Sequence, residues 1–485
     1  MSTEAESAQG RGLRRELRFW EAIALSIGIM APGAAMALNG TLPASLVGRA
    51  VPLAFVFAAV GILFVSYAFI RLTSYFNHAG SVYALSGVTL GPRAGFFSGW
   101  ALLGTYLSFT AASSAEVGLF GQAFFESTGI WPNAEWVVIS LVAAALIWFV
   151  AYGDVRVATR ALLGMEGLTV TLIVVVVVVI FARVISGSAP NGQGFTLSPF
   201  TPPSGVGLGT VALAAVFGLL SFGGFEGAAS LGEETDNPRR DIPRAIATAV
   251  ITMGIFYTIV MLAQTLGFGI DKQGTQNFAG SSSPLGDLSR SYVGPIMADA
   301  INFGVMVSAF ASALGTATAG SRMLFALCRD GFLSRRLGET SERTGSPANA
   351  LAVVMVIAIV AFVAQRIGGV SAVNAFFYPG TIGVLSMLVT YMVTNVGAIR
   401  FLFLSGRVRA WEAIVPVVAL AILVYVIYAN VYPVPDFPFN IFPYIVAAWL
   451  IVGLGTVVLV PGLARRIGAN LAEREGLALE ESPRP

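Results

Sequence analysis

Among the acidic residues in the long apolar stretches of this 485-residue sequence, we single out three: Glu116, Glu166 and Glu226. An ionisable side chain in an apolar layer is costly to bury, so each one is a functional candidate by default. A carboxyl group there can bind a proton or meet a cationic ammonium group. We expect a local hydrogen bond at Glu116, and proton coupling at Glu166 and Glu226. The last two have structural alternatives: Glu166 can simply pack between helices, and Glu226 can stay protonated and bond a neighbouring carbonyl.

Two apolar segments contain residues that interrupt helices. Pro32 removes a backbone donor and Gly33 permits unusual torsions, both in the middle of the first segment. A second break is expected at Gly223 and Gly224, just before Glu226. A helix broken within lipid frees amides and carbonyls, which must find a ligand, water or other protein groups. The alternative is that proline and glycine only kink these helices or let them pack closely.

The composition fits lipid better than water. Hydrophobic residues make up 56% of the chain and charged residues 11%, with a mean hydropathy of +0.79. Soluble proteins carry about 25% charged residues, so this chain could not cover its surface in water. The formal net charge of +2 gives no strong field that would attract nucleic acid.

The sequence supplies few groups for catalysis or metal binding. Cys328 is the only cysteine, which excludes an intramolecular disulfide and a multi-thiolate site. His78 is the only histidine, so a histidine-built metal site or catalytic triad is nearly excluded as well. No Gly-x4-Gly-Lys-Ser/Thr phosphate loop occurs, so we do not expect an ATP-driven pump. We therefore expect neither an enzyme nor a metal or resident cofactor.

About twelve segments are long and apolar enough to cross a membrane, because about 20 apolar residues span about 30 Å of hydrocarbon as a helix. Continuous apolar runs exclude the alternating pattern of a barrel. The third and eighth segments are rich in small residues, so we expect them inside the bundle. The expected spans are residues 20–45, 51–71, 95–125, 134–152, 160–184, 207–231, 244–269, 293–326, 348–366, 372–398, 410–430 and 441–463.

The basic residues support this arrangement. Of the 28 Lys and Arg, 23 lie in segments that face the cytoplasm if both ends of the chain do. This split follows the positive-inside rule. We expect an integral protein of the cytoplasmic membrane, with cytoplasmic tails at residues 1–19 and 465–485. The five in outer loops are Arg49, Arg183, Lys272, Arg290 and Arg366.

The two expected breaks fall in the first and sixth spans. Being five helices apart, they would lie in two halves of opposite orientation. Corresponding interruptions in inverted repeats point to the substrate site of a transporter. Half-helix N-termini there would face an anionic group, and the C-terminal ends a cation. The residues expected to contact substrate are Ile29, Met30, Ala31, Pro32, Gly33, Ala34, Ser221, Phe222, Gly223, Gly224, Phe225 and Glu226.

Four stretches of the chain are similar to segments of one transporter family. Ser221–Ile246 resembles the sixth-helix signature of the amino acid–polyamine–organocation (APC) superfamily permeases. Ala79–Tyr83 with Gly91-Pro92 looks like the loop that joins helices two and three of that family. Ser321–Gly331 is similar to the end of its eighth helix, and Tyr391–Asn395 to part of its tenth.

The resemblance implies an all-α fold with a five-plus-five inverted repeat, shared with the bacterial leucine transporter. The repeat would occupy residues 20–398, with two peripheral helices in residues 399–464. It also implies proton- or ion-coupled movement of amino acids, polyamines or related amines by alternating access. The chain departs from the family at the first break, where Ala31–Ala35 lacks the hydroxyl found in many amino acid permeases. A substrate carboxylate would then be held by backbone amides alone, which weakens the case for an ordinary α-amino acid.

Other side chains have candidate roles in the cycle. Phe222 and Phe225 could cover a bound substrate, although most of the 34 Phe residues must pack in the core or face lipid. Arg239 and Arg240 are candidates for inner-gate ion pairs, or simply belong to a solvated loop. Three small hydroxyl residues of the eighth span could help bind sodium, or only pack helices: Ser308, Ser312 and Thr316.

The sequence is best explained by a secondary active transporter of a small amino acid or amine, coupled to protons rather than sodium. The alternatives are a polyamine or organocation exchanger and a channel-like facilitator, although no repeated charged or carbonyl filter is visible. Its expected partners are the small-molecule substrate and the lipid bilayer, without nucleic acid. The sequence leaves the exact substrate, the direction of coupling and the oligomeric state open.

Overall fold

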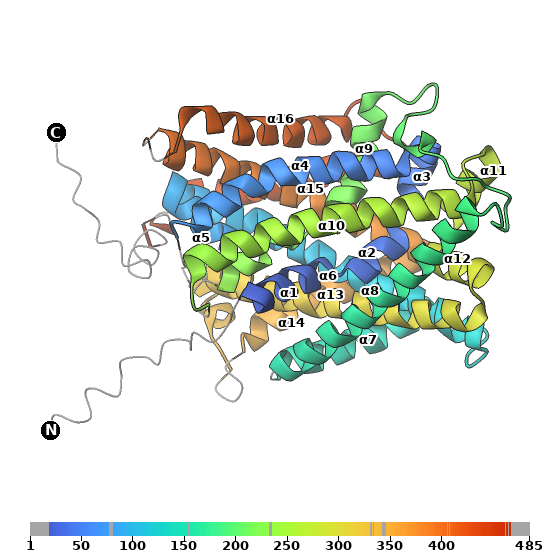
Figure 1. Ribbon diagram of the computed structural model, residues 1–485. Coiled ribbons are helices and arrows are strands. Elements are labelled where there is room, and N and C mark those ends of the chain that lie inside the picture. Colours follow the sequence, from blue (N-terminus) through green and yellow to red (C-terminus); the bar gives the residue numbers. More distant parts are fainter. Residues whose placement is uncertain are drawn as a thin grey trace.

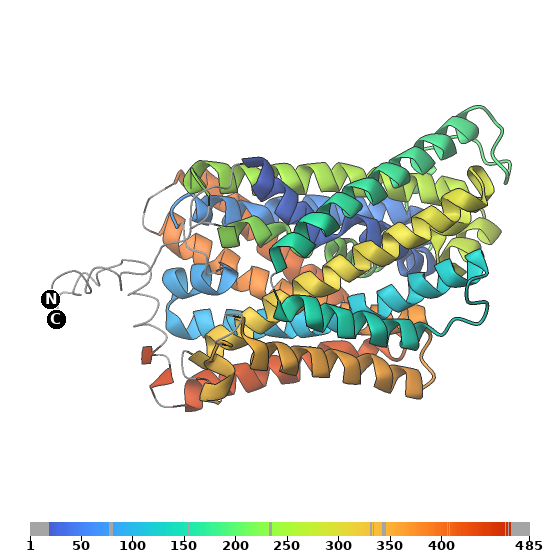
Figure 2. The same cartoon turned by 90° about the horizontal axis from the view of Figure 1, so that it is seen from below.

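The computed structural model describes residues 19–76, 81–153, 155–231, 235–329, 332, 334–341, 346–404, 406, 408–460, 462–463 and 465–466. Within these residues the chain is helical and contains no β-strand. The helices run lengthwise beside one another as a single bundle (Figures 1 and 2). The two tail predictions fall almost entirely outside the described residues.

Eight helices of the described chain are long and apolar enough to cross a membrane, and three shorter apolar helices accompany them. The chain is therefore an integral membrane protein with many spanning helices. The principal helices are α1 (Phe19–Met30), α2 (Pro32–Leu38), α3 (Thr41–Val47), α4 (Val51–Thr73), α5 (Ser81–Leu90), α6 (Pro92–Thr128), α7 (Trp136–Tyr152), α8 (Val155–Ile185), α9 (Leu208–Ser221), η3 (a 3-10 helix, Phe225–Leu231), α10 (Pro238–Phe268), α11 (Lys272–Gly280), α12 (Pro284–Tyr292), α13 (Pro295–Arg329), α14 (Ala348–Ile367), α15 (Ala372–Ala398), α16 (Ile414–Ala429) and α17 (Phe442–Leu459).

The centre of the bundle is built on α6 and α13, which pack along each other. Their Gly, Ala, Ser and Thr residues let the two backbones approach closely. Hydroxyl pairs connect them: Thr110 Oγ1 lies 3.2 Å from Thr316 Oγ1, and Ser113 Oγ lies 3.0 Å from Ser312 Oγ. The expectation that these two small-residue helices lie inside the bundle is confirmed.

Helix contacts recur between the first and second halves of the chain. The second expected span packs on the seventh (α4 on α10), and the third on the eighth (α6 on α13). The first span contacts the seventh (α1 and α10), and correspondingly the sixth contacts the second (α9 and α4). In the same way the fifth contacts the eighth (α8 and α13), and the tenth contacts the third (α15 and α6). These contacts of the first half thus have counterparts among the helices of the second half.

The last two helices attach to the outside of this core, α16 on α4 and α15, and α17 on α6. Trp100 of α6 and Trp449 of α17 stack with ring centroids 4.1 Å apart. Each indole Nε1 donates to the backbone carbonyl of the other tryptophan, at 2.7 and 3.0 Å. Gly104 and Gly453 leave room for the rings, since a Cβ there would lie within 2.6 and 2.2 Å of them.

Three helices were not foreseen. α5 lies in the segment that resembles a family loop, and it packs on α6 and α15. α11 and α12 occupy the connection between α10 and α13. All three have ten residues or fewer, so they leave no membrane-length apolar run for sequence analysis to find.

Candidate functional site

The first helix is broken at Ala31, as the sequence predicts. α1 ends at Met30 and α2 begins at Pro32. Ala31 between them has φ 43° and ψ 63°, the left-handed region. It is the one non-glycine residue of the described chain with positive φ. Such a conformation costs an L-residue roughly 1–2 kcal/mol, so the surrounding packing must hold it in place.

The amides freed by this break are bound by side chains of two other helices. The Gly33 N–H donates to Glu166 Oε1 of α8 at 2.7 Å, and the Ala34 N–H donates to Ser308 Oγ of α13 at 2.9 Å. Glu166 Oε2 is buried and has no hydrogen-bond partner among the described residues. A Cβ at position 33 would lie 2.9 Å from Thr169 Cγ2 and 3.1 Å from Glu166 Oε1. Glycine is therefore required for this close approach.

The sixth helix is broken at the predicted glycine pair. α9 ends at Ser221, and the 3-10 helix η3 begins at Phe225. Gly224 has φ 105°, which side chains rarely allow, and a Cβ there would lie 2.3 Å from Ile29 Cγ2. Ile29 also fills the space next to Gly227. Glycine at this break thus serves both the backbone torsion and the contact with the first helix.

Glu226 follows the second break and lies among aromatic rings. Tyr391 Oη of α15 donates to Glu226 Oε2 at 2.9 Å. The Tyr391 ring contacts Phe69 and Phe225 edge-on, with centroids 5.4 and 5.3 Å apart. The Glu226 carboxyl is therefore buried and bound by the Tyr391 hydroxyl.

The two breaks lie side by side. Ser26 Oγ of α1 donates to the Phe225 carbonyl at 3.1 Å and accepts from the Ala228 N–H at 3.0 Å. On the other side of the breaks, Asn39 Nδ2 donates to Ser221 Oγ at 2.7 Å. The expectation that the broken helices face each other is confirmed.

The twelve residues expected to contact substrate are brought together by this arrangement. Ile29, Gly223 and Gly224 are partly exposed, whereas the other nine are buried. Phe222 contacts Tyr257 edge-on at 5.1 Å, and Phe225 is fully buried near Phe69. Neither phenylalanine points into open space here, and their contact with substrate stays a prediction.

Glu116 differs from its expectation. It is 2% exposed, its Oε1 has no hydrogen-bond partner, and the described chain offers it no local bond. Continuing the antiparallel register of the hydroxyl pairs between α6 and α13 by one turn places Glu116 level with Ser308. Its carboxyl group interacts electrostatically with Glu166. A second acid therefore lies near the first break.

The remaining predicted residues are not gathered at the breaks. Ser312 and Thr316 pair with α6, so Ser308 is the one of the three hydroxyl residues that reaches the first break. Arg239 and Arg240 are exposed in the first turn of α10 and have no ion pair within the described residues. The acidic residues at positions 233 and 234 of the same stretch lie outside the described residues.

Several site residues were not singled out from the sequence. Ser26 and Asn39 join the two broken helices, Tyr257 Oη donates to the Ser221 carbonyl at 2.9 Å, and Tyr391 binds Glu226. Tyr391 belongs to the stretch that resembles part of the family's tenth helix, which was the one available signal. A polar residue within an apolar span was the corresponding signal for Ser26 and Asn39.

Comparison with known proteins points in the same direction. A family model described as amino acid permease matches residues 20–462. The branched-chain amino acid permease of Lactococcus lactis subsp. cremoris is 24% identical over 75% of this chain and 80% of its own. That of Bacillus subtilis is 27% identical over 71% and 73%. Cationic amino acid transporter 3, mitochondrial, of Arabidopsis thaliana is 23% identical over 79% of this chain and 63% of its own.

Proposed function

We propose that this chain, which belongs to the amino acid permease family, is a secondary active transporter of a small amino acid or amine. The observation that carries the proposal is the pair of adjacent helix breaks, each with a buried carboxyl group beside it. Paired interruptions of this kind mark substrate sites in transporters with inverted repeats. A permease releases its substrate unchanged, so we expect no enzymatic activity.

The proposed topology has twelve spans, with both termini in the cytoplasm and the chain in the cytoplasmic membrane. The recurring helix contacts support a repeat of five plus five helices in residues 20–398. The outward attachment of α16 and α17 supports a peripheral place for residues 399–464. The charge distribution supports the orientation, because 23 of the 28 basic residues would face the cytoplasm.

In the proposed cycle Glu166 couples a proton to the substrate site. A hydrogen bond to an ionised carboxylate is roughly twice as strong as one to a neutral acceptor. Protonation of Glu166 therefore weakens its hold on the Gly33 N–H, and a substrate carboxylate can then compete for that amide. Binding of a proton to Glu166 thus frees the backbone donors for the substrate, and release of the proton restores the original bond. Alternating access requires this step to be reversible. A sodium ion near Ser308 is the second candidate for the coupling ion.

Glu226 is the second proposed coupling group and the candidate partner for a substrate ammonium. Its place beside Gly224 and among aromatic rings supports a contact with a cation, which rings also attract. To contact a substrate ammonium, the Glu226 carboxyl must weaken or give up its hydrogen bond from Tyr391. The apolar residues around it, including Ile29, favour an apolar substrate side chain.

Branched-chain amino acids are the first substrates to test, because two relatives carry that name and the residues at the breaks are mostly apolar. Cationic amino acids come second, through the name of the plant relative. A polyamine or organocation exchanger and a channel-like facilitator are the remaining alternatives. An amino acid transporter, a polyamine or organocation exchanger and a channel-like facilitator differ in their substrates and in whether substrate flux is coupled to another ion or solute.

Counterflow in proteoliposomes tests the proposal. Liposomes loaded with unlabelled leucine should transiently accumulate labelled leucine, which is recovered unmodified, whereas a channel only equilibrates the label. An inward proton gradient should increase net uptake, and a sodium gradient should not. Lysine and putrescine in place of leucine assign the substrate class. Absence of counterflow with all three, in protein that remains folded, contradicts the proposal.

Arg239 and Arg240 are proposed to form inner-gate contacts that make and break as the bundle rocks. Their exposed position in the first turn of α10 supports a contact that is transient rather than permanent. Alanine at either position should lower the maximum transport rate and leave the half-saturating substrate concentration unchanged. A turnover equal to that of the parent in both variants would exclude the role.

A further inference from the structure

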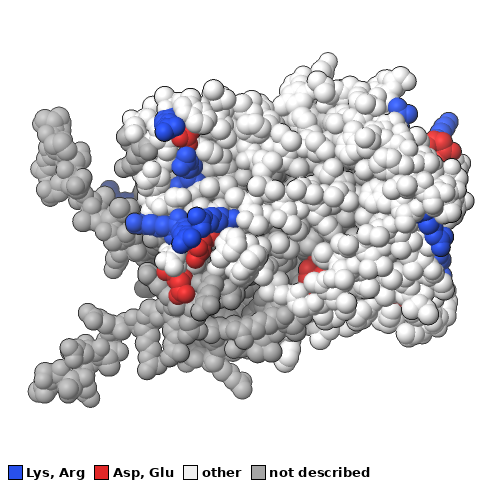
Figure 3. Space-filling view, in the orientation of Figure 1, with Lys and Arg blue, Asp and Glu red and all other residues white. Residues whose placement is uncertain are grey.

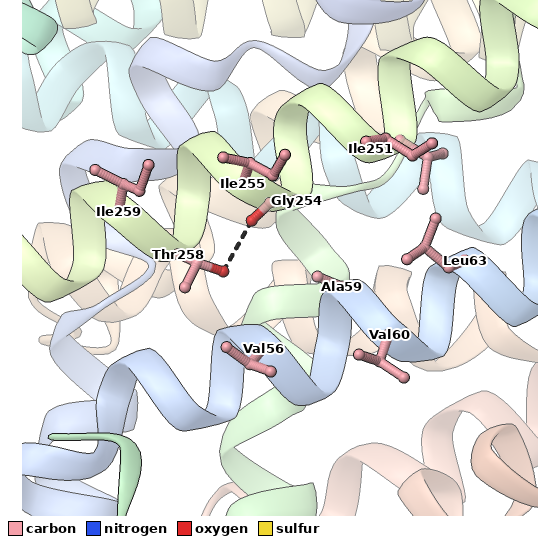
Figure 4. Close-up of a pocket in the computed structure, with 10 residues that line it drawn as sticks. Val56, Ala59, Val60, Leu63, Ile251, Gly254, Ile255, Thr258 and Ile259 are labelled. Carbon is pink, nitrogen blue, oxygen red and sulfur yellow. Dashed lines mark hydrogen bonds between the residues drawn. The ribbon is translucent and has the colours of Figure 1, made fainter. Parts of the chain in front are cut away.

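The outer surface between α4 and α10 carries an open groove that the proposed transport cycle does not use. Its volume is about 300 Å³. Figure 4 shows the two walls facing each other: Ile251, Ile255 and Ile259 of α10 across from Val56, Val60 and Leu63 of α4.

The groove is fit for hydrocarbon and not for water. Thr258 is its one polar side chain, and its Oγ1 already donates to the Gly254 carbonyl at 2.8 Å (Figure 4). At about 30 Å³ each, about ten waters would fit in the volume, but they would find almost no polar partners. A flexible apolar chain would instead bury both itself and the groove walls.

The floor of the groove lies over the second helix break. It is formed by Ala59 and Gly254, and a Cβ at position 254 would lie 3.2 Å from Ala59 Cβ and 3.9 Å from Phe222 Cζ. Phe222 stands between α9 and Gly224 in the broken helix. An occupant of the groove therefore rests on the residues that pack directly against this break.

A basic residue lies at one end of the groove. Arg244 precedes Ile251 by two helical turns, about 10 Å, on the same face of α10. It is exposed, and the described residues offer it no ion-pair partner. Arg71 of α4, at the same end, is bound to Glu412 and Tyr67. Figure 3 shows basic side chains, with some acidic ones beside them, at this end of the face and an almost uncharged middle.

We propose that the groove binds one acyl chain of an anionic phospholipid whose phosphate is held by Arg244. The wall from Val56 to Leu63 extends about 10 Å along its helix. This fits within one leaflet, which is about half of the 30 Å hydrocarbon layer. The headgroup lies in the leaflet at the Arg244 end, and the chain reaches inward over Gly254. Charge selects the headgroup and the apolar walls select the chain.

Native mass spectrometry of the full-length protein in detergent tests this site, with added phosphatidylglycerol and phosphatidylcholine of identical chains. The parent should retain phosphatidylglycerol preferentially. Arg244→Gln should lower its retention about fivefold, the effect of about one basic residue at an anionic surface, and leave phosphatidylcholine unchanged. Val60→Trp fills the groove from an exposed position and should lower the retention of both lipids.

Two matched variants serve as controls: Arg322→Gln, exposed near the end of α13, and Val178→Trp, exposed on α8. Both should retain phosphatidylglycerol as the parent does. Equal retention of the two lipids by the parent, or equal losses in Arg244→Gln and Arg322→Gln, would overturn the proposal. Normal lipid retention in Val60→Trp would also overturn the proposal. If that variant retained lipid normally and lost only self-association of the protein, the groove would be a contact between copies of the chain and not a lipid site. None of these readouts depends on transport.

Discussion

The two helix breaks lie next to each other but obtain their polar partners differently. At the first break, the freed amides of Gly33 and Ala34 are bound by Glu166 and Ser308, which belong to α8 and α13. At the second break the carboxyl group belongs to the broken helix itself. Glu226 directly follows that break, and its carboxyl accepts from the Tyr391 hydroxyl of α15.

Because of this difference, we expect Glu166 and Glu226 to have different roles. The partners of the first break belong to other helices, so we expect that a proton on Glu166 can change their bonds without altering the broken helix itself. Glu226 belongs to the broken helix, so we expect a change at its side chain to disturb that helix. We therefore place the stronger expectation of proton coupling on Glu166, and the predictions below test that asymmetry.

The largest effect is expected for Glu166→Gln. Glutamine keeps an oxygen that can accept from the Gly33 N–H, so the fold should survive while the exchangeable proton is lost. Proton-driven uptake should fall about tenfold or more, within the range of a typical coupling free energy, and its dependence on external pH should flatten. Uptake of labelled leucine over a series of external pH values is the measurement. A parent-like pH profile would remove Glu166 from the coupling step.

Glu135→Gln is the matched control for this experiment. Glu135 forms an exposed ion pair with Arg366, whose Nε lies 2.9 Å from Oε1. Its bond to Arg366 lowers the pKa of Glu135, so the stability from this pair is present above the unfolded-state pKa of about 4.3 and is lost as the pH falls through the lower folded-state value. The pair thus stays ionised near neutral pH, and its variant should keep the parent's pH profile.

Gly224→Ala should chiefly damage the fold. Its φ of 105° and the 2.3 Å approach of a Cβ to Ile29 Cγ2 both oppose a side chain. The torsional strain alone is of order 1–3 kcal/mol. Adding Ile29→Ala removes the closest contact but leaves the Cβ of residue 29 at 3.0 Å, so the double variant should recover only part of the thermal stability. Gly33→Ala adds no torsional strain, but its Cβ would lie 2.9 Å from Thr169 Cγ2 and 3.1 Å from Glu166 Oε1. It should lower transport, and lower thermal stability less than Gly224→Ala does. Equal thermal stability of Gly224→Ala and the parent would contradict this contrast.

Tyr391→Phe should have an intermediate effect. It removes the hydroxyl that donates to Glu226 and keeps the ring that contacts Phe69 and Phe225. We expect a loss of about 1–2 kcal/mol in the free energy of unfolding, because the carboxyl group stays buried with one donor fewer. Denaturation in detergent measures the loss, and uptake at several pH values shows whether coupling persists. A flattened pH profile would mean that Glu226 carries the proton after all.

Ser308→Ala should have the smallest effect. It leaves the Ala34 N–H without its acceptor, which should lower the free energy of unfolding by about 1 kcal/mol. The bond from the Gly33 N–H to Glu166 is kept. Ser312→Ala is the control, since Ser312 pairs with Ser113 away from the break. Sodium should not stimulate uptake by the parent. If sodium stimulates the parent but not Ser308→Ala, the coupling ion is sodium.

Much of the fold could be predicted because lipid leaves a direct signal in the sequence. A spanning helix needs a long apolar run, so the expected spans 348–366 and 372–398 nearly coincide with α14 and α15. The breaks could be predicted as well, since proline and glycine at mid-span act on the backbone locally. The local hydrogen bond expected for Glu116 was wrong, because the bundle places this residue between α6 and α13 without a local acceptor.

The sequence alone determined where the helices run, where two of them break and which acids lie in the apolar layer, because these properties depend on residues close together in the chain. Only the tertiary structure decided which groups meet at the breaks. Ser26 meets Phe225 across 199 positions, Asn39 meets Ser221 across 182, and Tyr391 meets Glu226 across 165. No local periodicity encodes such pairs, since they arise when helices pack side by side and their small residues set the register.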